Sequence, residues 1–157
     1  YEAVSYAWET QKRDRILICK GSALRITPNC EDALRRLRKP FTPRMLWIDA
    51  LCINQDDDAE RAQQVAIMGS IYLDATQVVV WLGKGDVHSK TCFRFFRLAK
   101  GFVETGNSRH KSLQEISQRG GLPVAGSLRA LLQRSWFNRT WVIQEVILNH
   151  NVVVLCG

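Results

Sequence analysis

The sequence lacks the marks of a membrane-spanning protein, a disulfide-stabilised domain and a metal protein. No apolar run approaches the roughly 18 residues that a membrane-spanning helix needs. The three histidines, His88, His110 and His150, never take metal-ligand spacing, so we expect no metal site. The cysteines are odd in number and contain no C-x-x-C pair, which gives no disulfide framework or zinc site and suits a reducing, intracellular compartment; they are Cys19, Cys30, Cys52, Cys92 and Cys156.

Common nucleotide-binding and catalytic motifs are also missing. There is no Walker sequence and no G-x-S-x-G elbow, and "GKGD" at 83–86 has only two of the glycines of a dinucleotide loop. Residues 56–58 are three aspartates without the glycine of a calcium loop, and the dipole of a helix start explains them better. Cys52 has no histidine that can be assigned as its base.

What is present is the composition of a folded domain. The chain has 157 residues, of which 46% are hydrophobic and 24% charged, so we expect one domain over residues 1–157 with a real core. Tyr1 is not an initiator methionine, and we therefore expect a domain taken from a longer protein. Residues 105–126 are polar and glycine-rich without a clear period, which predicts a mobile loop or insertion.

The net charge of +7 raises the question of a nucleic-acid or anionic-membrane partner. The densest basic segment is "LRRLRKPFTPR" at 34–44. Its arginines are dispersed and lack the interleaved aromatic residues that stack on bases. A solvated helix face is the favoured interpretation, and we expect neither nucleic acid nor membrane as a partner.

Patterns of strands and helices alternate along the chain. Residues 1–8 predict a strand, 16–26 a hairpin, and 28–38 a helix capped by Asn29. Residues 44–53 predict a strand with both faces buried, followed by a long helix with Asp57 and Glu60 as a capping box. Further strands at 77–83 and 151–156 flank two more helical stretches, the second broken near Asn138. This alternation predicts an α/β fold: a mostly parallel central sheet flanked by helices, with an added N-terminal hairpin.

Polar residues follow the predicted strand at 44–53, where ligands bind in open α/β sheets. They are Asp49, Cys52, Asn54 and Gln55. Arg61 begins the inward face of the next helix near the same edge, and a guanidinium there suits a carboxylate or phosphate. The structural alternative is that Asp49 caps loop amides and Arg61 pairs with it.

A second candidate site is "RSWFNRTWVIQE" at 134–145. Trp141 and Glu145 are spaced to share one helical face that is otherwise apolar. Burial disfavours the charged form of a carboxylate, which is how acid–base carboxylates are prepared. The alternative is a structural glutamate bonded to Arg134 or Arg139.

Two long segments resemble the signature blocks of the HET (heterokaryon incompatibility) domain of filamentous fungi. They are "LWIDALCINQDDDAERAQQVAIMGSIYLDATQVVVWLG" and "RSWFNRTWVIQEV", and the opening "YEAVSYAW" and closing "LCG" fit as well. One departure is Glu9 after Trp8, where the family usually has glycine. The resemblance implies a cytosolic (cytoplasmic) effector of innate immunity and programmed cell death in fungal non-self recognition. Such domains usually sit beside sensor or nucleotide-binding domains.

The HET family has been compared with the TIR domain, which implies a TIR-like or flavodoxin-like sandwich and an NAD-cleaving enzyme. "VSY" in the first strand and the Trp-x-x-x-Glu spacing of "WVIQEV" are similar to TIR sequences. Carried over to this sequence, the resemblance implies that Glu145 is the catalytic residue. It implies no cofactor, with NAD as the substrate. Trp141 or Trp136 would stack on nicotinamide, Arg61 or Arg139 would hold the pyrophosphate, and the polar rim would be completed by Asp49, Asn54 and Gln55.

A rival hypothesis from a different class is a non-enzymatic module that self-associates on activation and recruits a downstream death factor. Five tryptophans suit either hypothesis, since tryptophan serves both cores and interfaces. Convergence of Glu145, Arg61 and Asp49 in one cleft would favour the enzyme, and separate exposed patches would favour assembly. A nuclease suits the net charge but lacks an acid–x–Lys metal motif, and it ranks last.

Overall fold

A four-stranded parallel sheet organises the larger part of the computed structural model. Its strand order is β4 (Leu46–Trp47), β1 (Glu2–Tyr6), β5 (Gln77–Trp81) and β6 (Val152–Leu155), and every pair is parallel. β1 pairs with β5 along its whole length, from Glu2 opposite Gln77 to Tyr6 opposite Trp81. The central strands are buried on both faces, as expected for a parallel sheet. The predicted α/β fold with a mostly parallel central sheet is confirmed.

The structure describes residues 1–8, 11–104 and 123–157. These residues form two compact units: residues 1–84 together with 138–157, and residues 85–137. The sheet belongs to the first unit. Within the part of the chain that the structure describes, no helix is long and apolar enough to span a membrane.

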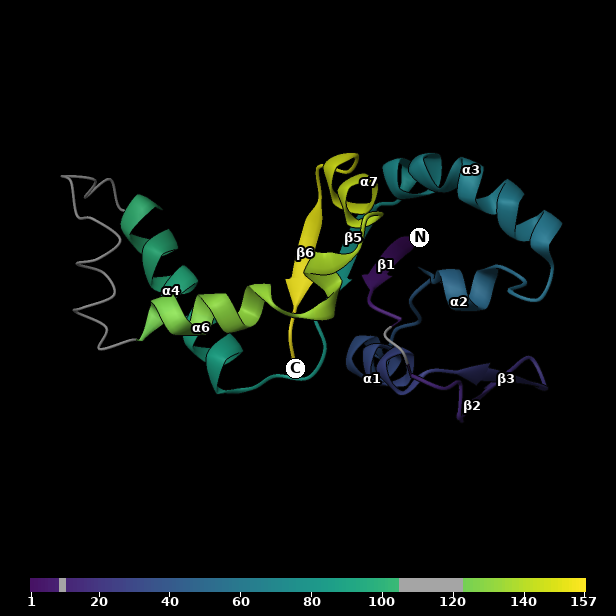
Figure 1. The fold of residues 1–157 in the computed structure, drawn as a ribbon, viewed down its shortest axis with the longest axis horizontal. Helices are drawn as coiled ribbons and strands as arrows, with labels where there is room; N and C mark the ends of the chain where they lie inside the picture. Colours follow the sequence, from purple (N-terminus) through teal and green to yellow (C-terminus); the bar gives the residue numbers. More distant parts are fainter. Residues whose placement is uncertain (9–10, 105–122) are drawn as a thin grey trace. The chain divides into compact units, whose positions relative to one another are not determined.

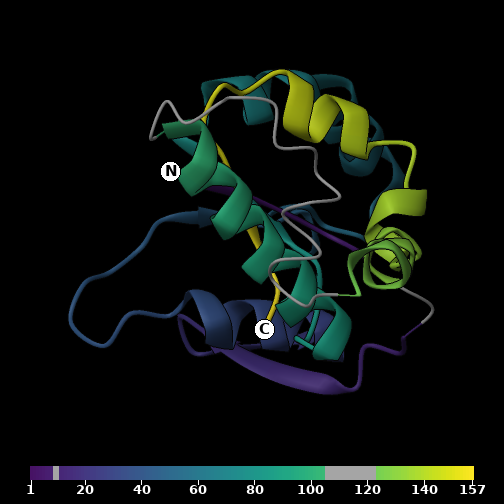
Figure 2. The same cartoon turned by 90° about the vertical axis from the view of Figure 1, so that its left-hand side faces the viewer.

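Helices cover both faces of the sheet in the first unit. Val4 and Tyr6 of β1 pack with Cys30 and Leu37 of α1 (Pro28–Leu37) in one core cluster. The alternate residue Ser5 faces α7 (Val142–Ile147), which packs against α3 (Asp58–Asp74). In both views α1 and the pair α3 and α7 lie on opposite sides of the strands (Figure 1, Figure 2).

The predicted hairpin is confirmed as β2 (Arg15–Cys19) and β3 (Ser22–Ile26), which pair antiparallel as a separate two-stranded sheet. Its turn residues, Lys20 and Gly21, both have positive φ, at 49° and 80°. Two successive positive φ values match the right-handed twist of the flanking strands in a two-residue hairpin loop.

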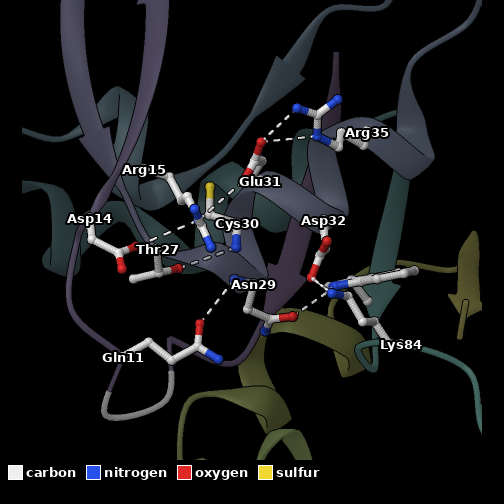
Figure 3. Close-up of polar contacts among 11 residues, drawn as sticks. Gln11, Asp14, Arg15, Thr27, Asn29, Cys30, Glu31, Asp32, Arg35 and Lys84 are labelled. Atoms are coloured by element: carbon white, nitrogen blue, oxygen red, sulfur yellow. Dashed lines mark hydrogen bonds and ion pairs between the residues drawn. The ribbon is translucent and has the colours of Figure 1, made fainter.

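The cap of α1 differs from the prediction. Thr27, not Asn29, is the N-cap, and its hydroxyl accepts a hydrogen bond from the amide of Cys30 (Figure 3). Asn29 is instead buried in the first turn, where its side chain donates to the Ala7 carbonyl at 2.7 Å and accepts from the Trp81 indole at 2.9 Å. Pro28, the first residue of the helix, is consistent with Thr27 as the cap, because proline is favoured at the position directly after an N-cap.

The predicted strand over 44–53 is wrong for most of its length. Only Leu46–Trp47 pair as β4, and a short helix, α2 (Asp49–Cys52), follows after one residue. The amide of its second residue, Ala50, donates to the side chain of Asp49, a local bond that competes with strand pairing. The predicted cap at Asp57 is confirmed for α3, but Glu60 accepts from the Asn54 amide, outside the expected capping box.

The second unit contains α4 (Val87–Glu104), α6 (Val124–Leu132) and most of the 3₁₀ helix η1 (Ser135–Asn138). Asp86 and Ser89 bond each other's amides at the start of α4. Of the predicted loop at 105–126, residues 105–122 lie outside the described part, and residues 124–126 begin α6. The break near Asn138 is confirmed by η1.

Replacing Asn29 with alanine should destabilise the first unit by about 2–4 kcal/mol, because the Trp81 indole and the Ala7 carbonyl lose buried partners. The exposed Asn54 provides the matched control, and Asn54→Ala should cost less than about 0.5 kcal/mol. Urea unfolding of the three proteins measures the difference. Equal midpoints for wild type and Asn29→Ala would contradict this role of Asn29.

Candidate functional site

The carboxyl ends of β1 and β4 bring Trp8 and Asp49 together at one edge of the sheet. The indole of Trp8 donates to one carboxylate oxygen of Asp49 at 2.8 Å, and the Ala50 amide donates to the other at 2.7 Å. Only 9% of Asp49 is exposed. Burial raises its pKa to about 6, although the hydrogen bonds from Trp8 and Ala50 act in the opposite direction.

The second carboxylate of the site, Glu145, lies in the first turn of α7 and is fully buried. Arg139 donates two hydrogen bonds to its carboxylate, of 3.0 and 2.8 Å, and the hydroxyl of Ser5 donates to one of the same oxygens. Three donors therefore satisfy a charge that would otherwise be costly to bury. Of the two structural partners considered from the sequence, Arg139 is the one present, while Arg134 pairs with Asp86 in the second unit.

A pocket of about 250 Å³ opens beside these groups, and we call it the Arg139 pocket. Its polar groups are two guanidinium groups, a carboxylate, an amide and two indoles, and the rest of its wall is apolar. The lining residues are Trp8, Asp49, Ile53, Gln55, Arg61, Val65, Met68, Arg139 and Trp141. A few convergent polar groups in an apolar wall are typical of a small-molecule site.

Hydrogen bonds hold the polar segment in the wall of this pocket. The side chain of Gln55 donates to the Asp49 carbonyl at 3.0 Å, and Arg61 donates to the Gln55 carbonyl at 3.3 Å. Arg61 also pairs with Asp58 one turn ahead, not with Asp49 as the structural alternative proposed. The guanidinium of Arg61 remains half exposed at the pocket.

The structure therefore brings together most of the predicted site residues. Five of them line the Arg139 pocket: Asp49, Gln55, Arg61, Arg139 and Trp141. Glu145 does not line it but lies directly behind Arg139. Trp141 is the N-cap of α7 and 46% exposed, and its side chain lines the pocket. Glu145, one turn later, is buried. Trp136 lies in the second unit, on η1.

Cys52 and Asn54 line a different pocket of about 660 Å³, which we call the Arg25 pocket. It lies between the β2–β3 hairpin and the segment that follows β4. Ile53 and Gln55 line both pockets, so this segment is a shared wall. α2 ends at Cys52, and the chain that follows is extended at Ile53, so that Ile53 and Gln55 reach the Arg139 pocket while Cys52 and Asn54 do not.

Two residues of the site, Ser5 and Trp8, were not identified as site residues from the sequence. Ser5 is the one serine in the buried strand "EAVSY", and a small polar side chain in a buried strand signals a partner. Trp8 carried no such signal, because its role depends on the return of β4 alongside β1. Among the described residues, no group of three or more histidine, cysteine or acidic side chains could hold a metal ion.

Comparison with known proteins gives two matches. The family model described as "Heterokaryon incompatibility protein (HET)" matches residues 1–145. The Neurospora crassa protein named "Heterokaryon incompatibility protein 6, OR allele" is 30% identical over 194 aligned residues. That alignment covers 100% of this chain and 28% of the relative, so this chain corresponds to a minor part of the relative's length. No solved structure matches the chain.

The pKa of Asp49 predicts a specific dependence of stability on pH. Because the folded pKa is raised from 3.8 to about 6, the stabilising contribution of its proton is complete below about pH 4 and is lost as the pH rises through about 6. Asp49→Asn lacks this loss. Between about pH 4 and pH 7, the stability of the variant relative to wild type should therefore rise by up to about 3 kcal/mol. Urea unfolding across this range measures the change, and parallel pH profiles would contradict it.

Proposed function

Because the chain belongs to the HET family, we propose that it acts in fungal non-self recognition as a cell-death effector that cleaves NAD at the Arg139 pocket. The family model and the name of the Neurospora relative support the role in heterokaryon incompatibility. The enzymatic part rests on the site. Its single strongest support is the convergence of Asp49, Arg61 and Arg139 on one pocket, with Glu145 behind it.

The groups of the pocket suit the nicotinamide end of NAD. The half-exposed indole of Trp141 offers a face to the positively charged nicotinamide ring, an arrangement that cation–π attraction favours. Arg61 and Arg139 can bind the adjacent phosphate with paired hydrogen bonds. Asp49 and Gln55 add acceptors and donors for ribose hydroxyls and the carboxamide.

Arg139 controls access to Glu145 in this proposal. The carboxylate is fully buried and bonded to the guanidinium, so it can meet a ribose only after Arg139 moves. A phosphate entering the pocket offers Arg139 an anion of equal or greater charge. The exchange leaves Glu145 beside the pocket, with Ser5 still donating to it.

The reaction then resembles glycoside hydrolysis. The bond between the nicotinamide nitrogen and ribose C1′ breaks, and its electron pair leaves with neutral nicotinamide. Glu145 stabilises the oxocarbenium-like charge that develops on the ribose. Water adds to C1′ and releases a proton, so the products are nicotinamide and ADP-ribose.

Nicotinamide release from NAD by wild type and Glu145→Gln tests the proposal. The amide keeps the shape of the side chain but removes its charge, and release should fall at least about a hundredfold. Glu2→Gln is the matched control, because Glu2 also accepts two hydrogen bonds from an arginine, Arg44, outside the pocket. Each substitution breaks one glutamate–arginine pair, but only Glu145→Gln should abolish release.

The outcomes separate the proposal from a purely structural glutamate. Equal release by wild type and a folded Glu145→Gln would remove Glu145 from the chemistry. Absence of release from concentrated wild-type protein would remove the enzymatic function altogether. Circular dichroism of each variant establishes that it is folded.

A second candidate function, self-association as a signalling module, is favoured by the exposed apolar face of α7. Ile143 and Ile147 are one turn apart and 61% and 68% exposed, on the same short helix whose carboxylate is buried. Burying these two side chains against a partner would remove their apolar surface from water. A second copy of the chain is the occupant that we propose for this face.

Replacing Ile143 and Ile147 together with glutamate should abolish self-association, because a charged face cannot be buried against a copy of itself. The matched control is the same double change at Ile16 and Ile18, which are both 67% exposed and share one face of β2. Light scattering over a range of concentrations gives the mass of each protein. A wild-type chain that stays monomeric at high concentration would contradict this second function.

A further inference from the structure

The Arg139 pocket and the Arg25 pocket are neighbours with a common wall. Ile53 and Gln55 line both of them. A residue of each pocket also contacts the other: the guanidinium carbon of Arg13, in the Arg25 pocket, lies 5.4 Å from the ring centre of Trp8, in the Arg139 pocket. The two pockets therefore border the same short segment of the chain, as two subsites for one extended ligand would.

The sizes of the two pockets indicate how an extended ligand would be divided. Sites for whole organic ligands usually have about 300–1,000 Å³. The Arg139 pocket, at about 250 Å³, is too small for a complete dinucleotide but large enough for one half. The Arg25 pocket, at about 660 Å³, has room for the larger half.

The charges of the Arg25 pocket favour a phosphate. Arg13 and Arg25 both line it, and neither guanidinium forms an ion pair with the residues that the structure describes. Ala23 and Arg25 alternate on β3, which places a small side chain next to the guanidinium and leaves space above it. Unpaired guanidinium groups facing a cavity are well suited to bind phosphate oxygens in pairs.

One acidic group in the same pocket distinguishes a nucleotide from a simple anion. Asp56 lines the Arg25 pocket without pairing with either arginine, and its negative charge opposes the binding of a free inorganic phosphate. The same carboxylate accepts hydrogen bonds from ribose hydroxyls, as acidic residues do in many dinucleotide sites. The pair of arginines and the single aspartate thus match a phosphate joined to a ribose.

We propose that the Arg25 pocket binds the adenosine monophosphate half of a dinucleotide whose other half, nicotinamide mononucleotide, occupies the Arg139 pocket. Arg13 and Arg25 hold the phosphate on the adenosine side, and Asp56 binds the adenosine ribose. This inference rests on the proposed function for the identity of the dinucleotide. It adds a second subsite, on the opposite side of the segment Ile53–Gln55.

Calorimetric titration of ADP, which carries the adenosine half and the second phosphate but no nicotinamide riboside, tests the subsite without any cleavage. ADP should bind wild type, and Arg25→Gln should weaken its binding about tenfold or more, because a paired, charge-assisted contact is lost. The matched control is Arg35→Gln, which removes the same charge from an exposed arginine of α1 outside both pockets. Arg13→Gln serves as the second variant should Arg25→Gln fail to fold.

Titration with nicotinamide mononucleotide completes the test, since it carries the half assigned to the Arg139 pocket. Its binding should be the same for Arg25→Gln and wild type. Absence of ADP binding to wild type, or equal weakening by Arg25→Gln and Arg35→Gln, would overturn the subsite. ADP binding that depends on Arg25 supports it even if NAD is not cleaved, so failure of this inference and failure of the enzymatic proposal give different results.

Discussion

The first unit depends on one buried charge, the carboxylate of Glu145. Arg139 and Ser5 together make three hydrogen bonds to it, and Ser5 belongs to the central strand β1. Removing one partner of a buried ion pair typically costs about 3–5 kcal/mol, so this cluster fixes the segment from Arg139 to Glu145 against the sheet. The position of Trp141, two residues after Arg139, follows from that anchoring. The pairing of Arg139 with Glu145 both stabilises the fold and separates the carboxylate from the Arg139 pocket.

The polar segment after β4 has its place because the strand is so short. β4 ends at Trp47, and Asp49 turns the chain into α2 by bonding the Ala50 amide and the Trp8 indole. The chain then passes between two pockets, with Ile53 and Gln55 in the wall of both. In the proposed function this segment serves two subsites at once, one on each side of it.

The sequence predicted the elements far better than the contacts between them. Periodicity identified the parallel sheet, the hairpin and the Asp57 cap, because these are local patterns. It overextended the strand after Arg44, since a buried strand and a short buried helix have similar apolar patterns. It could not choose between Arg134 and Arg139 as the partner of Glu145, and it could not find the contact of Ser5 with Glu145, 140 residues apart. The contact between Ser5 and Glu145 forms only when the folded sheet brings two distant segments together.

A crystal structure of the chain with ADP-ribose would show whether Arg139 exchanges Glu145 for a bound phosphate. We expect the guanidinium of Arg139 on a phosphate and the carboxylate of Glu145 facing the ribose, with the adenosine half in the Arg25 pocket. A bound complex in which Arg139 still grips Glu145 and the ligand lies elsewhere would contradict it.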